Sequence, residues 1–313
     1  MWKRLMGLSV LFALCALLAQ IPVSLAQNRA EMVHYLLIGV DSWGVNEEGS
    51  ARSDAIILAS LDGQHDRIHF TSFARDSLVK PSYRKSAVKL NTLVRSSMGE
   101  HMLIEYLEEA FGLPISGYFV INFSGAVDVV NAIGGIDVSL TGEEVAYLEA
   151  LVGGYEDYPL QEGVCRLNGE QAIYYMRCRS LDNDFGRQRR QGRVLEGAFH
   201  ALKDLSVIEA LALLDEVMGM YRTNLSIPQQ IALATRAVTL ADAQLEMNSL
   251  PMEGAYRYGQ DSYGASGLEF DVALCRAQLY SWLGLEDPQG AALLESWEAE
   301  RAEPESTPIV FAP

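Results

Sequence analysis

The sequence of 313 residues has few cysteines, at positions 15, 165, 178 and 275. Cys15 falls in an apolar N-terminal stretch, so an odd number remains and a full disulfide framework is excluded. Cys165 and Cys178 are close enough in sequence to form one disulfide outside the cell, or to be two buried thiols, and the sequence leaves both open.

Several common catalytic signatures are also missing. The chain has no G-x-S-x-G, no H-E-x-x-H, no P-loop and no paired C-x-x-C. These absences argue against the familiar serine hydrolases, zinc proteases and P-loop enzymes. The five histidines are scattered, and His34 and His69 fall in apolar stretches where a structural role is the simpler interpretation. There is no internal repeat.

Basic residues are scarce, with 24 Lys and Arg against 41 Asp and Glu and a net charge of -17. General nucleic-acid binding needs many cations to neutralise phosphates, so we expect no nucleic-acid partner. Any anionic ligand has to be held by a local group of cations.

The N-terminal stretch has the pattern of an export signal. Lys3 and Arg4 precede an uncharged run from Leu5 to Ala19, and small residues end at Ala26. We interpret residues 1–26 as a signal peptide or a membrane anchor, and the sequence does not decide between them. Because positive residues stay inside, we expect the rest of the chain to be extracytoplasmic, anchored to the membrane or secreted to the cell envelope.

Short apolar runs at 34–41, 55–62 and 68–76 predict three strands, the last two joined as a hairpin at Asp62-Gly63. Further elements alternate in a βαβ manner: a helix near 101–111, a strand at 118–123, a helix at 124–132 capped by Ser124, and a strand at 136–140. Helices are then predicted at 169–177 after an Asn168 cap, at 187–203, at 206–222 and from Ser226 onward.

We therefore predict one α/β domain over residues 30–284, with helices covering a mixed sheet. Residues 285–313 hold several prolines with many Glu and Ala, and are interpreted as an acidic tail with at most one short helix.

Carboxylates and arginines gather at the ends of the predicted strands, where open α/β sheets place their ligands. The residues are Asp41, Arg52, Asp54, Arg75 and Asp76. Carboxylates without nearby Cys or His suit Mg²⁺, and guanidinium groups suit phosphate oxygens, so the set predicts a magnesium-bound diphosphate. The alternative is a set of turn residues paired with one another.

Six arginines lie between residues 177 and 193. In an extended segment Arg177 and Arg179 point the same way, and in a helix Arg187 and Arg190 share a face, with Asp184 just ahead as cap or base. The alternative is a solvated helix face held by ion pairs. Few acids lie nearby in the sequence, which favours an external anion as the partner of these arginines.

Six separated blocks of the sequence resemble the signature blocks of the LytR-CpsA-Psr (LCP) family. They are "LLIGVD", "RSDAIIL", "SFARDSLV", "KLN", "INFSGAVDVVNAIGGIDV" and "LNGEQAIYYMRCRSLDNDFGRQRRQGRVL", in family order over roughly residues 33 to 200. The resemblance implies a single three-layer αβα domain that binds a polyprenyl diphosphate lipid. It also implies Mg²⁺-assisted transfer of a glycan such as teichoic acid or capsule from that lipid to peptidoglycan, at the membrane surface.

Residue by residue, the resemblance makes Asp41 and Asp54 the magnesium ligands. The resemblance makes Asp184 the candidate base, and in the mechanism that we expect Asp184 or Asp76 takes the proton of the acceptor hydroxyl. The diphosphate contacts that it implies are Arg52, Arg75, Lys89, Arg177, Arg179, Arg187, Arg190 and Gln191.

Two departures from the family pattern concern the site. The chain has Ser42, Trp43 and Gly44 where many members carry an arginine, and "ARD" where "PRD" is usual. Two other functions stay open at this point: hydrolysis of the same lipid diphosphate, and a non-catalytic envelope protein that binds anionic lipid or polymer.

Overall fold

The structure is a computed structural model that describes residues 32–41, 52–95, 99–182, 184–203, 205–240 and 242–302. The predicted leader at 1–26, the departure at 42–44 and the last residues of the predicted tail lie outside the described residues. Within the described ranges, no helix has the length and apolar character needed to cross a bilayer.

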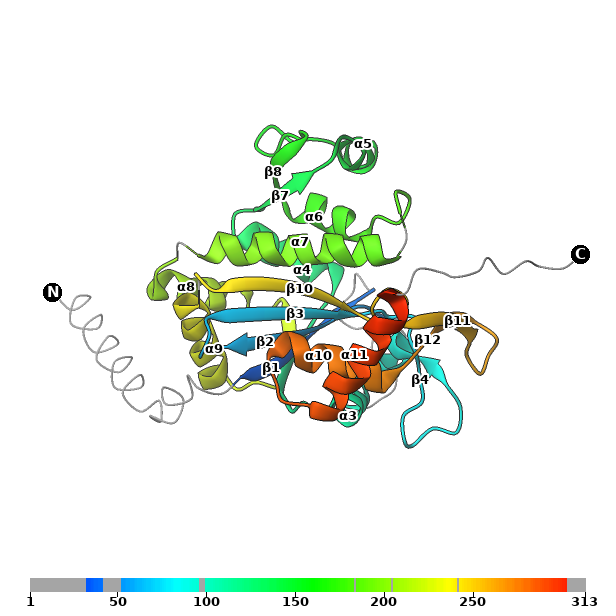
Figure 1. Cartoon of the computed structure of the whole chain (residues 1–313). Helices are drawn as coiled ribbons and strands as arrows, with labels where there is room; N and C mark the ends of the chain where they lie inside the picture. The colour runs from blue at the N-terminus through cyan, green and yellow to red at the C-terminus, as the bar shows by residue number, and fades with distance from the viewer. Residues whose placement is uncertain are drawn as a thin grey trace, which may run out of the picture.

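A mixed six-stranded sheet lies at the centre of the molecule (Figure 1). Its strands are β1 (Val33–Val40), β2 (Ser53–Asp62), β3 (Arg67–Phe73), β6 (Ile115–Ile121), β9 (Tyr221–Thr223) and β10 (Gln244–Leu250). The spatial order is β10-β3-β2-β1-β6-β9. Strand β1 is antiparallel to β2 and parallel to β6, so the sheet is mixed as predicted. The hairpin at Asp62-Gly63 is confirmed, because β2 and β3 are antiparallel neighbours.

Helices cover both faces of this sheet. They are α3 (Gly99–Phe111), α4 (Phe123–Ala132), α5 (Gly142–Leu151), α6 (Gly169–Arg177), α7 (Asp184–Leu202), α8 (Val207–Val217), α9 (Ile227–Thr239), α10 (Val272–Leu283) and α11 (Pro288–Ala302), with a 3-10 turn η2 (Leu90–Arg95). Figure 1 shows α7 along one face of the sheet and α3 and α10 on the other. The predicted three-layer αβα arrangement is confirmed.

The alternation of side chains along β1 explains the two layers. Leu36 and Ile38 point to one face and join the largest apolar cluster, which includes Leu103 of α3 and Leu279 of α10. Tyr35 and Leu37 point to the other face and pack with residues of α7 and α9. A strand buried on both faces reads as a continuous apolar run, as "HYLLIGV" does.

A smaller layer lies outside α7, at the top of Figure 1. It contains the two-stranded sheet of β7 (Ile136–Leu140) and β8 (Gly163–Leu167), together with α5 and α6. The strand predicted at 136–140 is confirmed, but β7 pairs only with β8 among the described strands, so β6, α4 and β7 do not form a βαβ unit of the central sheet. Gly134 and Gly135, both at positive φ, turn the chain out to this layer.

Two further two-stranded units project from the end of the sheet that carries the predicted site (Figure 1). One pairs β4 (Leu78–Val79) with β5 (Val88–Lys89), and the other is the hairpin of β11 (Tyr256–Gln260) and β12 (Ser266–Phe270). The sequence interpretation did not include this hairpin. The backbone N–H of Leu268 donates to the carbonyl of Asp76 at 2.9 Å, which holds the hairpin against the chain after β3.

Three predicted boundaries need correction. The cap of α4 is Asn122 and not Ser124, and the Asn122 side chain accepts a hydrogen bond from the N–H of Gly125. Asn and Ser are both favourable caps, and the helix begins at Phe123, one residue earlier than predicted. The helix predicted over 206–222 ends at Val217, and Tyr221–Thr223 join the central sheet as β9. Residues 288–302 form the full helix α11, whose Leu294 packs with α10, so this part of the predicted tail belongs to the fold.

Candidate functional site

Strand ends bring the predicted acidic and basic residues together at one edge of the sheet. Asp41 directly follows β1 and Arg52 directly precedes its antiparallel neighbour β2, so the two residues are adjacent. The N–H of Asp41 donates to the carbonyl of Arg52 at 3.0 Å, and the N–H of Arg52 donates to Oδ1 of Asp41 at 2.6 Å. Asp54 lies in β2 and Arg75 follows β3.

These residues line a cavity of about 570 Å³. It is called here the diphosphate cavity, after the ligand that the sequence predicts. Among the described residues, five arginines and two aspartates line it, a surplus of three positive charges in a chain whose net charge is -17. A cavity with positive lining attracts anions even on an acidic protein, because the local field is focused by the surrounding low dielectric. The charged lining residues are Asp41, Arg52, Asp54, Arg75, Arg177, Arg179 and Arg187.

Asp54 is the point at which the arginines meet. Its Oδ1 accepts a hydrogen bond from Nη1 of Arg75 and lies 3.9 Å from Nη2 of Arg179 and 4.0 Å from Nη1 of Arg187. The three guanidinium groups come from the end of β3, the α6–α7 connection and α7. Asp76 also lies 3.4 Å from Nε of Arg75, so among the described residues three guanidinium groups meet two carboxylates here.

Arg187 is the most buried of the cavity arginines, with 2% of its surface exposed. A guanidinium buried to this degree is usually paired, and the Asp54 carboxylate lies 4.0 Å from Nη1 of Arg187. Gln191, one helical turn further along α7, lines the same cavity and donates from Nε2 to the carbonyl of Asp54 at 3.5 Å. Both residues therefore lie where the sequence placed them.

Arg177 and Arg179 both line the diphosphate cavity, while Cys178 between them is fully buried. Arg177 is the last residue of α6, and its guanidinium lies 4.3 Å from the ring centroid of Phe123 in a cation–π contact. Phe123 lines the cavity too, at the start of α4. The sequence interpretation missed this role, although an aromatic residue directly after a strand end and a helix cap was its signal.

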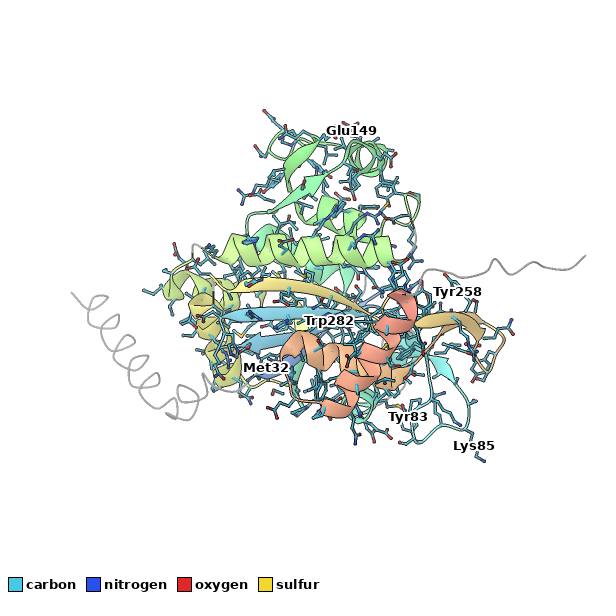
Figure 2. All side chains as sticks on the ribbon, in the orientation of Figure 1. Met32, Tyr83, Lys85, Glu149, Tyr258 and Trp282 are labelled. Atoms are coloured by element: carbon cyan, nitrogen blue, oxygen red, sulfur yellow. The ribbon has the colours of Figure 1, made fainter. Side chains whose placement is uncertain are left out.

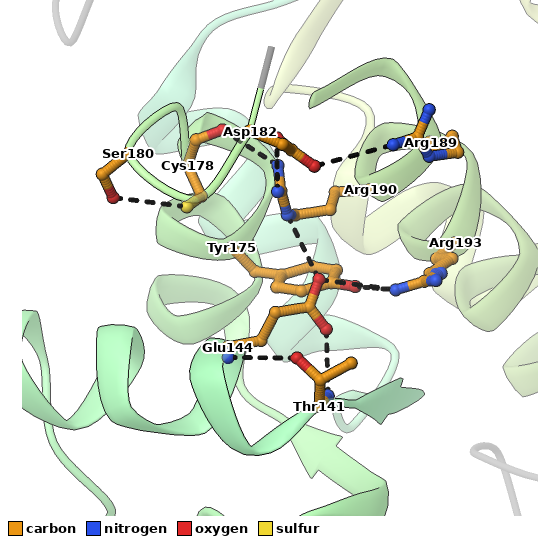
Figure 3. Close-up of polar contacts among 9 residues, drawn as sticks. All are labelled: Thr141, Glu144, Tyr175, Cys178, Ser180, Asp182, Arg189, Arg190 and Arg193. Atoms are coloured by element: carbon orange, nitrogen blue, oxygen red, sulfur yellow. Dashed lines mark hydrogen bonds and ion pairs between the residues drawn. The ribbon is translucent and has the colours of Figure 1, made fainter. Parts of the chain in front are cut away.

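Arg190 does not line the diphosphate cavity; it lies in a separate ion-pair cluster shown in Figure 3. Its Nε lies 3.2 Å from Glu144, its Nη2 lies 2.7 Å from Asp182, and its Nη1 donates to the carbonyl of Cys178 at 3.0 Å. Helix α7 has two buried sides at this point, so Arg187 and Arg190 face different partners. Glu144 of α5 is a partner that local sequence did not reveal.

Lys89 and Asp76 lie in a second cavity of about 590 Å³, called here the hairpin cavity. It shares Arg52 and Arg75 with the diphosphate cavity and is otherwise lined by the β4–β5 unit, η2 and the β11–β12 turn. Nζ of Lys89 donates to Oδ1 of Asp76 at 2.9 Å, and Nε of Arg75 lies 3.4 Å from Oδ2.

The protonation of Asp76 follows from these contacts. Burial raises the pKa of the Asp76 carboxyl, but the hydrogen bond from Lys89 and the nearby positive charges outweigh burial, so its pKa is lowered overall. Asp76 is therefore ionised at neutral pH and is a weak base. The side chain of Asp184, the other predicted base, lies outside the described part of the structure, and its role stays a prediction.

The donor set of the diphosphate cavity is compatible with magnesium. Asp41 and Asp54 both line it, and Mg²⁺ commonly takes one or two carboxylates together with substrate phosphates. Among the described residues there is no group of three or more His, Cys, Asp and Glu side chains that would form an all-protein metal site.

The histidines and cysteines take no part in the cavity. His34 is 4% exposed, and its Nδ1 hydrogen-bonds with the Ser60 hydroxyl at 2.8 Å, in keeping with the structural role predicted for it. Cys165, Cys178 and Cys275 are buried free thiols in the structure, which resolves the open alternative against a disulfide.

Comparison with known proteins gives matches over most of the domain. The LytR_cpsA_psr family matches residues 18–277. A polyisoprenyl-teichoic acid–peptidoglycan teichoic acid transferase TagU of Enterococcus faecalis is 31% identical over 64% of this chain and 63% of its own length. A transferase TagV of the same description from Bacillus subtilis is 28% identical over 63% of this chain and 51% of its own length. The match thus spans about half to under two thirds of these relatives.

Solved structures share the fold. TagT bound to LIIa-WTA superimposes with a TM-score of 0.65 at 24% identity, covering 82% of this chain and 92% of that one. The crystal structure of B. subtilis TagV gives 0.64 at 24% identity, covering 82% of this chain and 99% of that one. With a family match over most of the chain, the same fold and the arginine-lined cavity, the protein belongs to the LytR-CpsA-Psr family.

Proposed function

We propose that this protein transfers a glycan polymer from a polyprenyl diphosphate carrier to peptidoglycan, outside the cytoplasmic membrane. The observation that carries the proposal is the meeting of Arg75, Arg179 and Arg187 at Asp54 inside one cavity. The family membership and the names of the relatives, which are teichoic acid transferases acting on peptidoglycan, support the same class of reaction.

The chemistry needs positioning and charge neutralisation more than a covalent residue. An acceptor sugar hydroxyl attacks the phosphorus that carries the glycan, and a new O–P bond forms as the bond to the bridging oxygen breaks. Polyprenyl phosphate leaves, and the hydroxyl proton passes to a carboxylate, Asp184 or Asp76. Arg75, Arg179 and Arg187 stabilise the negative charge that collects on the phosphate oxygens.

Arg52, Arg177 and Gln191 line the same cavity and would hold the diphosphate from its other sides. Asp41 and Asp54 would hold Mg²⁺, which when bound neutralises part of the diphosphate charge. The Asp54 carboxylate would then contact both Mg²⁺ and the arginines. Removal of divalent cations with EDTA should therefore abolish transfer, and restored Mg²⁺ should recover it in the wild type but not in Asp54→Asn.

The test uses the full chain with a polyprenyl diphosphate-linked glycan, peptidoglycan and Mg²⁺, and measures phosphate-linked glycan on peptidoglycan. We expect Arg187→Ala and Arg179→Ala to lower the rate at least about a hundredfold, because each removes a preorganised cation from the developing charge. Arg179 is half exposed, so its replacement does not threaten the fold.

The matched control is Arg189→Ala, which removes a guanidinium that is 65% exposed on the same helix and should leave the rate unchanged. Full activity in folded Arg179→Ala and Arg187→Ala would overturn the assignment. Release of carrier with no glycan attached to peptidoglycan would identify a hydrolase instead.

A further inference from the structure

The hairpin cavity extends beyond the diphosphate cavity and is formed by three separate parts of the chain. The N–H of Ser262 donates to the carbonyl of Ala87 at 3.1 Å, which ties the β11–β12 turn to the β4–β5 unit. Oδ1 of Asp261 accepts from the N–H groups of Tyr263 at 2.9 Å and Ala265 at 2.8 Å, which fixes the shape of that turn. The walls are therefore held in place before any ligand binds.

Two polar atoms in these walls have no hydrogen-bond partner among the described residues. Asn91 is 3% exposed, and its Oδ1 is buried and unpaired. Nε of Arg84 is buried and unpaired as well; another part of this guanidinium interacts with the Tyr83 hydroxyl, and the ion pairs found among the described residues do not include Arg84. Both residues line the cavity. A buried acceptor and a buried donor left unpaired each cost free energy that a ligand would recover.

The rim of the cavity carries an exposed aromatic ring. Tyr263 lines the cavity and is 84% exposed. Figure 2 shows the hairpin, marked by Tyr258, and the β4–β5 connection, marked by Tyr83 and Lys85, at the same end of the molecule. An aromatic face beside hydrogen-bonding groups suits a ligand with one apolar face and many hydroxyls.

We propose that the hairpin cavity binds the acceptor: an acidic saccharide that stacks on Tyr263, pairs its carboxylate with Arg84 and hydrogen-bonds to Asn91. A sugar hydroxyl both donates and accepts, so it satisfies either kind of orphaned group. The proposal rests on the proposed function and names a subsite for its second substrate.

The position of the cavity suits the acceptor. Arg52 and Arg75 face both cavities, so a ligand in the hairpin cavity ends beside the diphosphate, where the attacking hydroxyl has to be held. Four cations and two carboxylates of the described residues line it, so the lining attracts an acidic saccharide, while the carboxylates accept hydrogen bonds from its hydroxyls. Lys89 is paired with Asp76, which leaves Arg84 as the cation for an acidic substituent.

The test is calorimetric titration of the full chain with two probes: a soluble peptidoglycan disaccharide that contains N-acetylmuramic acid, and geranyl diphosphate with Mg²⁺. We expect Arg84→Gln and Tyr263→Ala to raise the Kd of the disaccharide at least about tenfold, which corresponds to about 1.4 kcal/mol. The Kd of geranyl diphosphate should change less than about twofold in both variants. A neutral N-acetylglucosamine disaccharide should bind more weakly than the acidic one to the wild type, and equally to Arg84→Gln.

The matched control is Tyr258→Ala, which removes a tyrosine that is 76% exposed on the same hairpin but does not line the cavity. It should bind both probes like the wild type. Unchanged disaccharide binding in Arg84→Gln and Tyr263→Ala, an equal loss in Tyr258→Ala, or a loss of geranyl diphosphate binding instead would each overturn the proposal.

The titrations involve no turnover, so they separate the two hypotheses. Disaccharide binding that depends on Arg84 and Tyr263 in a protein that transfers no glycan would leave this subsite standing and reject the proposed function. Transfer with the same acceptor KM in the wild type and both variants would keep the function and reject the subsite.

Discussion

Replacement of Arg190 by alanine should destabilise the protein without removing a diphosphate contact. Arg190 is 3% exposed and makes ion pairs with Glu144 at 3.2 Å and Asp182 at 2.7 Å, besides a hydrogen bond to the carbonyl of Cys178 (Figure 3). Its removal takes the 3.2 Å ion pair away from the Glu144 carboxylate, whose side chain is only 9% exposed.

Breaking a buried ion pair by removing one partner costs roughly 3–5 kcal/mol. The lower end applies here, because Nη1 of Arg193 stays 3.4 Å from the same Glu144 oxygen and Asp182 is partly exposed. A loss of about 3 kcal/mol in the free energy of unfolding lowers Tm by about 6–9 °C in a domain of this size. Urea and thermal unfolding followed by circular dichroism measure both quantities.

Arg189→Ala is the matched control, because this arginine is 65% exposed, lies next in sequence and pairs with Asp182 only at 3.7 Å. Its cost should stay below about 1 kcal/mol, as for most exposed ion pairs. The double variant Arg190→Ala with Glu144→Ala should cost less than the sum of the two single changes. An Arg190→Ala protein that unfolds like the wild type but no longer binds geranyl diphosphate would refute this reasoning and return Arg190 to the diphosphate site.

Two other predictions concern the core. Burial, with the charge of His69 as a smaller cause, lowers the pKa of His34 from 6.5 to about 4, so the unfolded chain binds a proton between these values that the folded chain does not. The free energy of unfolding is therefore unaffected by His34 above pH 6.5 and falls by about 3 kcal/mol as the pH drops to 4. His34→Gln should make the free energy of unfolding less dependent on pH between 7 and 4. An unchanged pH dependence in this variant would contradict the prediction. Cys165, Cys178 and Cys275 should resist iodoacetamide in the folded protein and all react after denaturation without reductant, as read by mass spectrometry; a mass that shows two of them oxidised would contradict the free thiols.

Strand register alone brings together one group of the predicted residues. Asp41, Arg52 and Asp54 flank two antiparallel strands, and β2 and β3 are joined by a short hairpin that brings Arg75 back beside Asp54. The apolar runs fix where each strand begins and ends, so they also fix the end of the sheet at which the flanking charged residues lie. The sequence was therefore enough to predict this half of the cavity.

The errors arose where a partner lies far away in the chain. Arg190 shares a local pattern with Arg187, and only the packing of α5 against α6 and α7 gives it Glu144, 46 residues earlier. The strands β11 and β12 mix aromatic residues with charged residues and glycines and are only five residues long, so they lack a clear apolar alternation. Helix α11 was taken for a tail because its few apolar residues, among them Leu294 and Trp297, are separated by Glu and Ala.

The central claim is that the carrier diphosphate binds between Asp54 and the arginines around it. A crystal structure of the full chain with a short polyprenyl diphosphate and Mg²⁺ tests it most directly. We predict both phosphates in the diphosphate cavity, within hydrogen-bond distance of Arg75, Arg179 and Arg187. Phosphates bound elsewhere on the molecule, with these arginines still turned to Asp54, would contradict the claim.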